Sequence, residues 1–139
     1  LIEVALAPVV GGISDRRGRL YPIRGALVLL AGVALAFALV TPAALVALLV
    51  VGASLAASGI YTPGIALVSD RAEANRMPQT LAFGLMNVAW ALGAMTGPAA
   101  GGALADAIGD PAPYIVCAAL ALATLVVVDR TAGVQPEPA

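Results

Sequence analysis

The chain has 139 residues, of which 61% are hydrophobic and 11% are charged, with a net charge of −1 at pH 7. Soluble domains carry roughly a quarter of charged residues, so this composition excludes an ordinary soluble domain and indicates an integral membrane protein. Aromatic residues make up 4% and no basic cluster lies outside loop positions, so no nucleic-acid partner is expected. There is no His and one cysteine, Cys117, which leaves no basis for a metal site or a cofactor.

Residues 1–13 are predicted to be the end of a membrane helix that begins before Leu1, so we expect a fragment of a longer protein. Glu3 lies about 18 Å from Asp15 along such a helix, near the middle of a hydrocarbon core of roughly 30 Å. A carboxylate at that depth costs on the order of 3 kcal/mol unless it is paired, protonated or in water. Glu3 is therefore a candidate proton or substrate site, unless the helix tilts or ends so that Glu3 lies near an opening.

A compact charged turn at residues 11–19 follows. Its pattern is Gly, any three, Asp-Arg, any one, Gly-Arg, and it is filled by Gly11, Asp15, Arg16, Gly18 and Arg19. Glycines allow a tight reversal, and the arginines favour the cytoplasmic side of a membrane. Arg residues alone are unspecific, because any cytoplasmic loop between membrane helices is rich in Arg. The spacing of Gly and Asp is what makes this pattern specific.

This loop resembles the signature of the major facilitator superfamily, secondary transporters built from two six-helix halves. The resemblance implies an all-α, polytopic membrane bundle and a role for the loop in conformational switching. Asp15, Arg16 and Arg19 are then expected to pair with a helix end or with acidic residues on the same side of the membrane. The next loop on that side, residues 69–79, offers Asp70 and Glu73.

Two predicted spans come next, residues 23–40 and residues 43–68, joined by a minimal turn that makes them antiparallel. Arg24 is expected to reach back to the cytoplasmic surface. Pro63 is expected to bend or tilt the longer span.

Ser54, Ser58 and Tyr61 share one face of that longer span, with Thr62 beside them. They can line a polar path, but small polar residues at this spacing more often let helices pack closely.

The fourth predicted span, residues 80–104, carries a spaced set of glycines and one proline. These are Gly84, Gly93, Gly97, Pro98, Gly101 and Gly102. Glycines at four-residue steps strip a helix face so that another helix can approach, and the proline adds a bend. The pattern resembles the glycine-proline signature of drug:proton antiporters in the same superfamily, whereas a plain packing motif would not require the proline or the distant Gly84.

Two further residues of this span are candidate contacts for a substrate. Asn87 is polar at membrane depth and needs a partner. Trp90, the only Trp, lies well inside the span and not at its interface. Cavity contact and interhelical packing remain open for both residues.

Residues 106–113 are predicted to form an outer loop, residues 112–128 a last short span, and residues 131–139 a disordered cytoplasmic tail. The transmembrane region is thus expected over residues 1–130, with one partial and four full helices. Because successive loops lie on opposite sides of the membrane, all seven Arg fall on one side. Arg residues favour the cytoplasmic side, so that side, and with it the C-terminus, is expected to be cytoplasmic.

The resemblance fits helices two to six or eight to twelve of a twelve-helix fold. We expect the later set, because the chain ends in a polar tail and because Leu48 stands where the first half usually carries an Arg before a Gly. The glycine signature would then lie in the eleventh helix, although antiporters carry it in the fifth.

The sequence favours alternating-access transport in the cell membrane, specifically proton-coupled efflux of an amphipathic compound. Uptake of a sugar or other nutrient is the alternative within transport, and a non-transporting membrane anchor or signalling partner is the alternative outside it. An enzyme is not expected, since no cluster of acid, base and nucleophile appears. The expected partners are a small-molecule substrate, protons, the lipid bilayer and the N-terminal half of the same protein.

Overall fold

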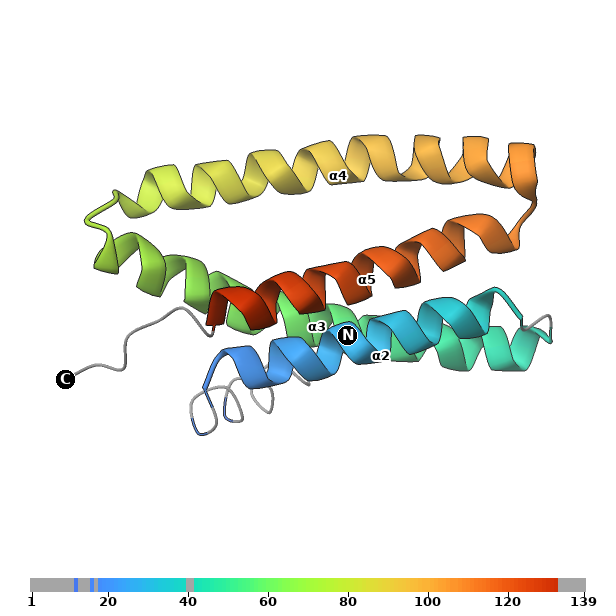
Figure 1. Ribbon diagram of the computed structural model, residues 1–139, viewed down its shortest axis with the longest axis horizontal. Helices are drawn as coiled ribbons and strands as arrows, with labels where there is room; N and C mark the ends of the chain where they lie inside the picture. Colours follow the sequence, from blue (N-terminus) through green and yellow to red (C-terminus); the bar gives the residue numbers. More distant parts are fainter. Residues whose placement is uncertain (1–11, 13–15, 17, 40–41, 133–139) are drawn as a thin grey trace.

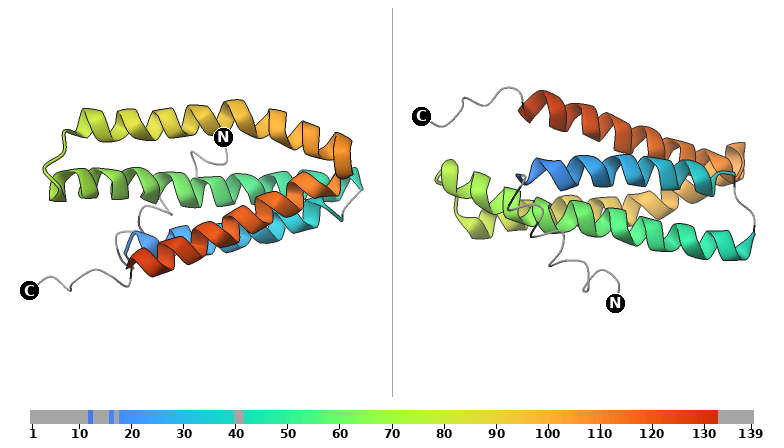
Figure 2. Two further views of the ribbon diagram at one scale, coloured as in Figure 1. Left: turned by 45° about the horizontal axis from the view of Figure 1, so that its top comes forward. Right: turned by 90° about the horizontal axis from the view of Figure 1, so that it is seen from below.

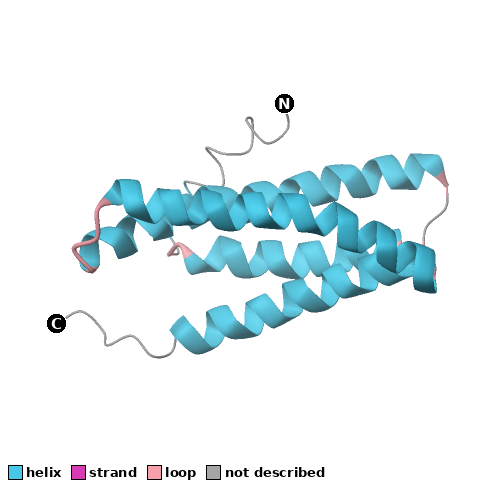
Figure 3. Ribbon diagram, turned by 90° about the horizontal axis from the view of Figure 1, so that it is seen from above, coloured by secondary structure: helices cyan, strands magenta, loops and turns pink. Residues whose placement is uncertain are grey.

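The computed structural model describes residues 12, 16, 18–39 and 42–132. Within these ranges the chain forms α2 (Leu20–Phe37), α3 (Ala43–Ala74), α4 (Gln79–Ile108) and α5 (Pro111–Ala132), and it contains no strand. Successive helices run in opposite directions (Figure 1), and Figure 3 shows only helices joined by short loops. The predicted all-α helical bundle is confirmed.

All four described helices are long and apolar enough to cross a membrane. The longest, α3, has 32 residues. At a rise of about 1.5 Å per residue it extends well beyond a hydrocarbon core of roughly 30 Å. The chain is therefore part of a multi-pass membrane protein, with the polar C-terminal end of α3 outside the apolar layer.

The predicted loop at residues 69–79 is wrong for its first half, because α3 continues to Ala74. Asp70 and Glu73 thus lie on the last turns of a helix. The side chain of Asn75 donates through Nδ2 to the backbone oxygen of Arg71, 2.8 Å away, and so satisfies an end carbonyl. A helix that extends beyond the membrane can carry charged residues, so the charges of Asp70 and Glu73 were not evidence for a loop.

The predicted outer loop at residues 106–113 is also wrong. Helix α4 runs to Ile108 and α5 begins at Pro111, so Asp106 is helical and the connection is only residues 109–110. Gly109 has φ of +113°, a conformation that side chains disfavour, and it ends α4. Pro111 fits a first helical position, where no backbone N–H is needed.

Helix α2 forms the centre of the packed region, between α3 and α5 (Figure 2). The core consists mainly of small and aliphatic side chains. Its buried members are Ile23, Leu27, Ala31, Ala34, Ala118 and Ala121. Helices α2 and α3 lie close together at Gly59, where an added Cβ would lie 2.7 Å from the Cβ of Ala26. Small residues are what allow two membrane helices to come this close.

An aromatic contact joins α2 to α5 at the end where α2 finishes. The rings of Phe37 and Tyr114 are stacked, with centroids 5.5 Å apart and an interplanar angle of 17°. Such pairs stabilise by about 0.5–1.5 kcal/mol beyond the area that they bury.

Helix α4 is the least packed of the described helices, and Ala82 is its only buried residue. It lies apart from α2 in Figure 1 and in the left-hand view of Figure 2. A Cβ added at Gly84, Gly93, Gly97 or Gly102 would meet nothing within 4 Å, and one at Gly101 would lie 3.8 Å from the Cβ of Pro113. Among the described helices only α5 reaches these glycines, at Gly101 and at ordinary van der Waals distance, so the packing and bending roles of the set remain predictions.

Candidate functional site

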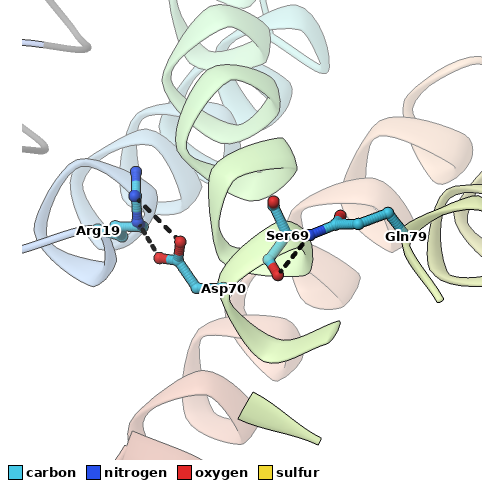
Figure 4. A network of polar contacts seen from close by, with 4 residues as sticks. All are labelled: Arg19, Ser69, Asp70 and Gln79. Atoms are coloured by element: carbon cyan, nitrogen blue, oxygen red, sulfur yellow. Dashed lines mark hydrogen bonds and ion pairs between the residues drawn. The ribbon is translucent and has the colours of Figure 1, made fainter. Parts of the chain in front are cut away.

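Except for Asp106, the charged residues of the described helices lie towards one end of the bundle, the end where α2 and α4 begin and α3 and α5 finish (Figure 1). There Arg19 is paired with Asp70. The guanidinium donates through Nε and Nη2 to the two carboxylate oxygens, and Nη2 lies 3.2 Å from Oδ1 (Figure 4). The sequence predicted this pairing among several, and it ties the start of α2 to the end of α3.

Two neighbouring residues extend this contact towards α4. The side chain of Gln79 donates through Nε2 to the backbone oxygen of Ser69, 3.3 Å away (Figure 4). Ser69 directly precedes Asp70, so the Arg19 ion pair and the start of α4 are joined through one helix turn.

A second ion pair links α2 to α5. Arg24 Nε lies 2.6 Å from Asp129 Oδ1. The sequence suggested only that Arg24 reaches the membrane surface, and it missed this partner 105 residues away. The available signal was that an Arg and an Asp each flank an apolar span on the same side of the membrane.

Part of the predicted switch loop lies outside the described residues, namely Gly11 and Asp15, and so does Glu3. Gly18 has φ of +85°, which explains why this position of the signature needs glycine. Arg16 is exposed, and none of the carboxylates in the described ranges forms an ion pair with it.

A pocket of about 370 Å³ lies between α3 and α4. No charged residue lines it, and its wall is mostly apolar. The lining residues are Ile60, Tyr61, Gly64, Ile65, Val68, Met86, Asn87 and Trp90. The structure thus brings together Asn87 and Trp90, the two candidate substrate contacts of the fourth span, with Tyr61 from the third.

The residues of the polar face predicted on α3 have different surroundings in the structure. Ser58 is 5% exposed, whereas Tyr61 is 59% exposed and lines the pocket. Ser54 and Thr62 are half-buried and do not line it. The burial of Ser58 agrees with the packing interpretation, whereas Tyr61 lies on the wall of the pocket and its contact with a substrate stays a prediction.

The pocket lies at membrane depth. Asn87 and Trp90 are about 12 Å and 17 Å from the start of α4 at Gln79, along a helix of 30 residues. Water is scarce at that depth, so polar groups there must find partners in protein or ligand.

The sequence profile of the Major Facilitator Superfamily matches residues 1–138. The chain belongs to the major facilitator superfamily. A relative within the superfamily, the tetracycline resistance protein, class C, of Escherichia coli, is 35% identical over 126 residues. That match covers 86% of this chain and 29% of the relative, so the chain spans less than a third of the relative's length. No solved structure matches the chain.

Membership of this superfamily points to a transporter and not to an enzyme. In the ranges that the structure describes, no group of three or more His, Cys, Asp or Glu side chains could hold a metal ion. Which six-helix half of a superfamily member the chain represents remains a prediction.

Proposed function

We propose that this chain is part of a secondary transporter that exports a small amphipathic compound in exchange for protons. The observation that carries the proposal is the uncharged, largely apolar pocket at membrane depth. A strongly ionic nutrient would find no opposite charge on these walls, and burying its charge there would be costly. Similarity to a tetracycline resistance protein supports export, because export of a toxic compound confers resistance.

The charged end of the bundle is proposed as the cytoplasmic switch region, built on Gly11, Asp15, Arg16, Gly18 and Arg19. Its two ion pairs join α2 to α3 and to α5. An alternating-access cycle opens and closes one side at a time, so helix ends held by ion pairs provide contacts that can break and reform. The excess of Arg at this end supports the cytoplasmic orientation, with the C-terminus on the same side.

Glu3 is proposed as the proton site. The carboxylates in the described ranges lie near helix ends or in the connection between α4 and α5, away from the middle of the membrane. They are Asp70, Glu73, Asp106, Asp110 and Asp129. Proton-coupled exchange needs a group that can be reached alternately from the two sides, and the sequence places Glu3 nearest to the required depth.

The test uses the full-length protein in inside-out membrane vesicles that carry a pH gradient, with tetracycline as the first probe. We expect addition of tetracycline to release protons from the vesicles while the probe accumulates inside. Glu3→Gln should abolish the dependence of accumulation on the gradient, whereas Glu73→Gln at a helix end should preserve it. Proton movement into the vesicles on adding glucose, in the same direction as the sugar, would indicate nutrient symport instead, and no movement of any probe would favour a non-transporting role.

A further inference from the structure

We propose that the pocket between α3 and α4 binds a planar, uncharged aromatic compound with a hydrogen-bonding edge, which stacks on Trp90 and bonds to Asn87 and Tyr61. The inference rests on the proposed transport function for its role in the cycle, because it names the chemical class of the compound carried. The binding step itself can be measured without any transport.

The volume and the apolar lining of the pocket limit which ligands can bind in it. A volume of about 370 Å³ lies at the lower end of the range typical of pockets for drug-sized ligands. Ile60, Ile65 and Val68 form an aliphatic wall on α3. Such a wall favours an apolar face on the ligand and disfavours a sugar, whose many hydroxyl groups would lose their hydrogen bonds with water.

Trp90 supplies the surface for stacking. Its side chain is 69% exposed although it lies at membrane depth, and no described aromatic ring contacts it. The neighbouring Met86 places a polarisable thioether in the same pocket. Aromatic faces and Met sulfur both bind flat rings well, so a planar ligand gains more here than a globular one of equal volume.

Asn87 and Tyr61 supply the polar contacts. Neither side chain has a hydrogen-bond partner among the described residues, although both line an apolar pocket at membrane depth. An amide left unpaired in such surroundings costs about 1–3 kcal/mol, so a ligand that offers both a donor and an acceptor removes a penalty. Asn87 can donate and accept at once, which suits an imide or a ring amide.

A neighbouring helix is a poorer occupant. Helices approach closely over small residues, and α4 offers these in the glycines at 93, 97 and 101. Met86 and Trp90 are bulky and hold a helix backbone away from this section of α4. The pocket therefore lies on the section of α4 that directly precedes the glycine stretch.

The experiment measures binding of lumichrome to the purified full-length protein by equilibrium dialysis. Lumichrome is an uncharged, planar, three-ring compound with N–H and C=O groups along one edge. We expect saturable binding by the wild type, a Kd about tenfold higher for Trp90→Leu and about fivefold higher for Asn87→Leu. Trp90→Phe should fall between wild type and Trp90→Leu, since it keeps a smaller ring.

Matched controls lie on the same helix outside the pocket. Leu92→Ala truncates another exposed apolar residue, and Thr96→Val removes a hydroxyl that donates to the backbone oxygen of Leu92. Both should leave the Kd within about twofold of wild type. Tyr61→Phe, which removes one oxygen only, gives a variant that tests the pocket with the least risk to folding.

Absence of lumichrome binding by the wild type, equal affinity in the pocket variants and the controls, or displacement of lumichrome by glucose would each overturn the proposal. The vesicle assay is read separately. If lumichrome binding depends on Trp90 and Asn87 but no proton-driven transport is seen, the binding site stands and the proposed exporter function is rejected. If proton-driven transport is seen but the pocket variants bind lumichrome as well as wild type does, the exporter function stands and the binding site is rejected.

Discussion

Helices α2 and α4 show opposite ways of using small residues. The shorter helix, α2, has 18 residues and buries six of them, whereas α4 has 30 residues and buries only Ala82. Yet α4 carries the longer series of glycines. Small residues thus permit close packing without causing it, because a partner must present a matching surface.

The difference assigns separate tasks to the two regions. Helices α2, α3 and α5 form a framework held by a core, a stacked aromatic pair and two ion pairs. Helix α4 keeps an open face, and with α3 it encloses the pocket that contains Asn87 and Trp90. Substitutions in the framework should therefore change stability, whereas substitutions at the pocket should change binding.

The largest effect is expected for Gly59→Ala. The new Cβ would lie 2.7 Å from the Cβ of Ala26, so α2 and α3 must separate. We expect a loss of about 1–3 kcal/mol in the free energy of unfolding, measured as a lower Tm of the full-length protein in detergent. Gly32→Ala on α2, where a Cβ would meet nothing within 4 Å, is the control and should not lower Tm. Equal Tm values for the two variants would mean that α2 and α3 are not in close contact.

The next effect is expected at the aromatic stack. Phe37→Leu and Tyr114→Leu each remove one ring of the pair that joins α2 to α5. A double-mutant cycle on unfolding in detergent should give a coupling energy of about 1 kcal/mol. Leu35→Ala, on an exposed residue of the same helix, should show no coupling with Tyr114→Leu. A coupling near zero for the aromatic pair would place the two rings apart.

A smaller effect on stability, about 0.5–1 kcal/mol, is expected for the pair of Arg19 with Asp70, since both side chains are partly exposed. Arg19→Asp should also slow transport in the vesicle assay by more than this loss explains, because it removes a contact of the proposed switch. Combining Arg19→Asp with Asp70→Arg should restore at least half of the rate. If the transport rates of these variants change only in proportion to the amount of folded protein, the pair of Arg19 and Asp70 has no role in switching.

The smallest effect is expected for Arg24 and Asp129, with a coupling energy of about 0.5 kcal/mol because the side chains are 45% and 50% exposed. Raising the salt concentration should weaken it. Arg130→Gln is a neighbouring control that removes a charge without breaking an ion pair seen in the described ranges. Unchanged coupling in high salt would argue that the contact is not electrostatic.

Most of the fold could be predicted from the sequence alone. Long apolar runs predicted the spans, since a helix must be about 20 residues long to cross the bilayer. The loop pattern from Gly11 to Arg19 indicated the superfamily, and the polarity of Asn87 together with the position of Trp90 indicated the candidate site. These features are local, so composition and spacing are sufficient to detect them. The ends of the helices were misjudged, because charges near Asp70 and Asp106 fit equally well on a helix that extends beyond the membrane.

Only the tertiary structure decided which residues meet. It paired Arg24 with Asp129, packed a neighbouring helix tightly against Gly59 and not against the glycines of α4, and placed Tyr61 in the pocket while burying Ser58. Each outcome depends on the rotation and separation of whole helices, which arise from many small packing terms along their length. Helical spacing states which residues share a face, but the neighbour that this face contacts is set by every other residue that packs there.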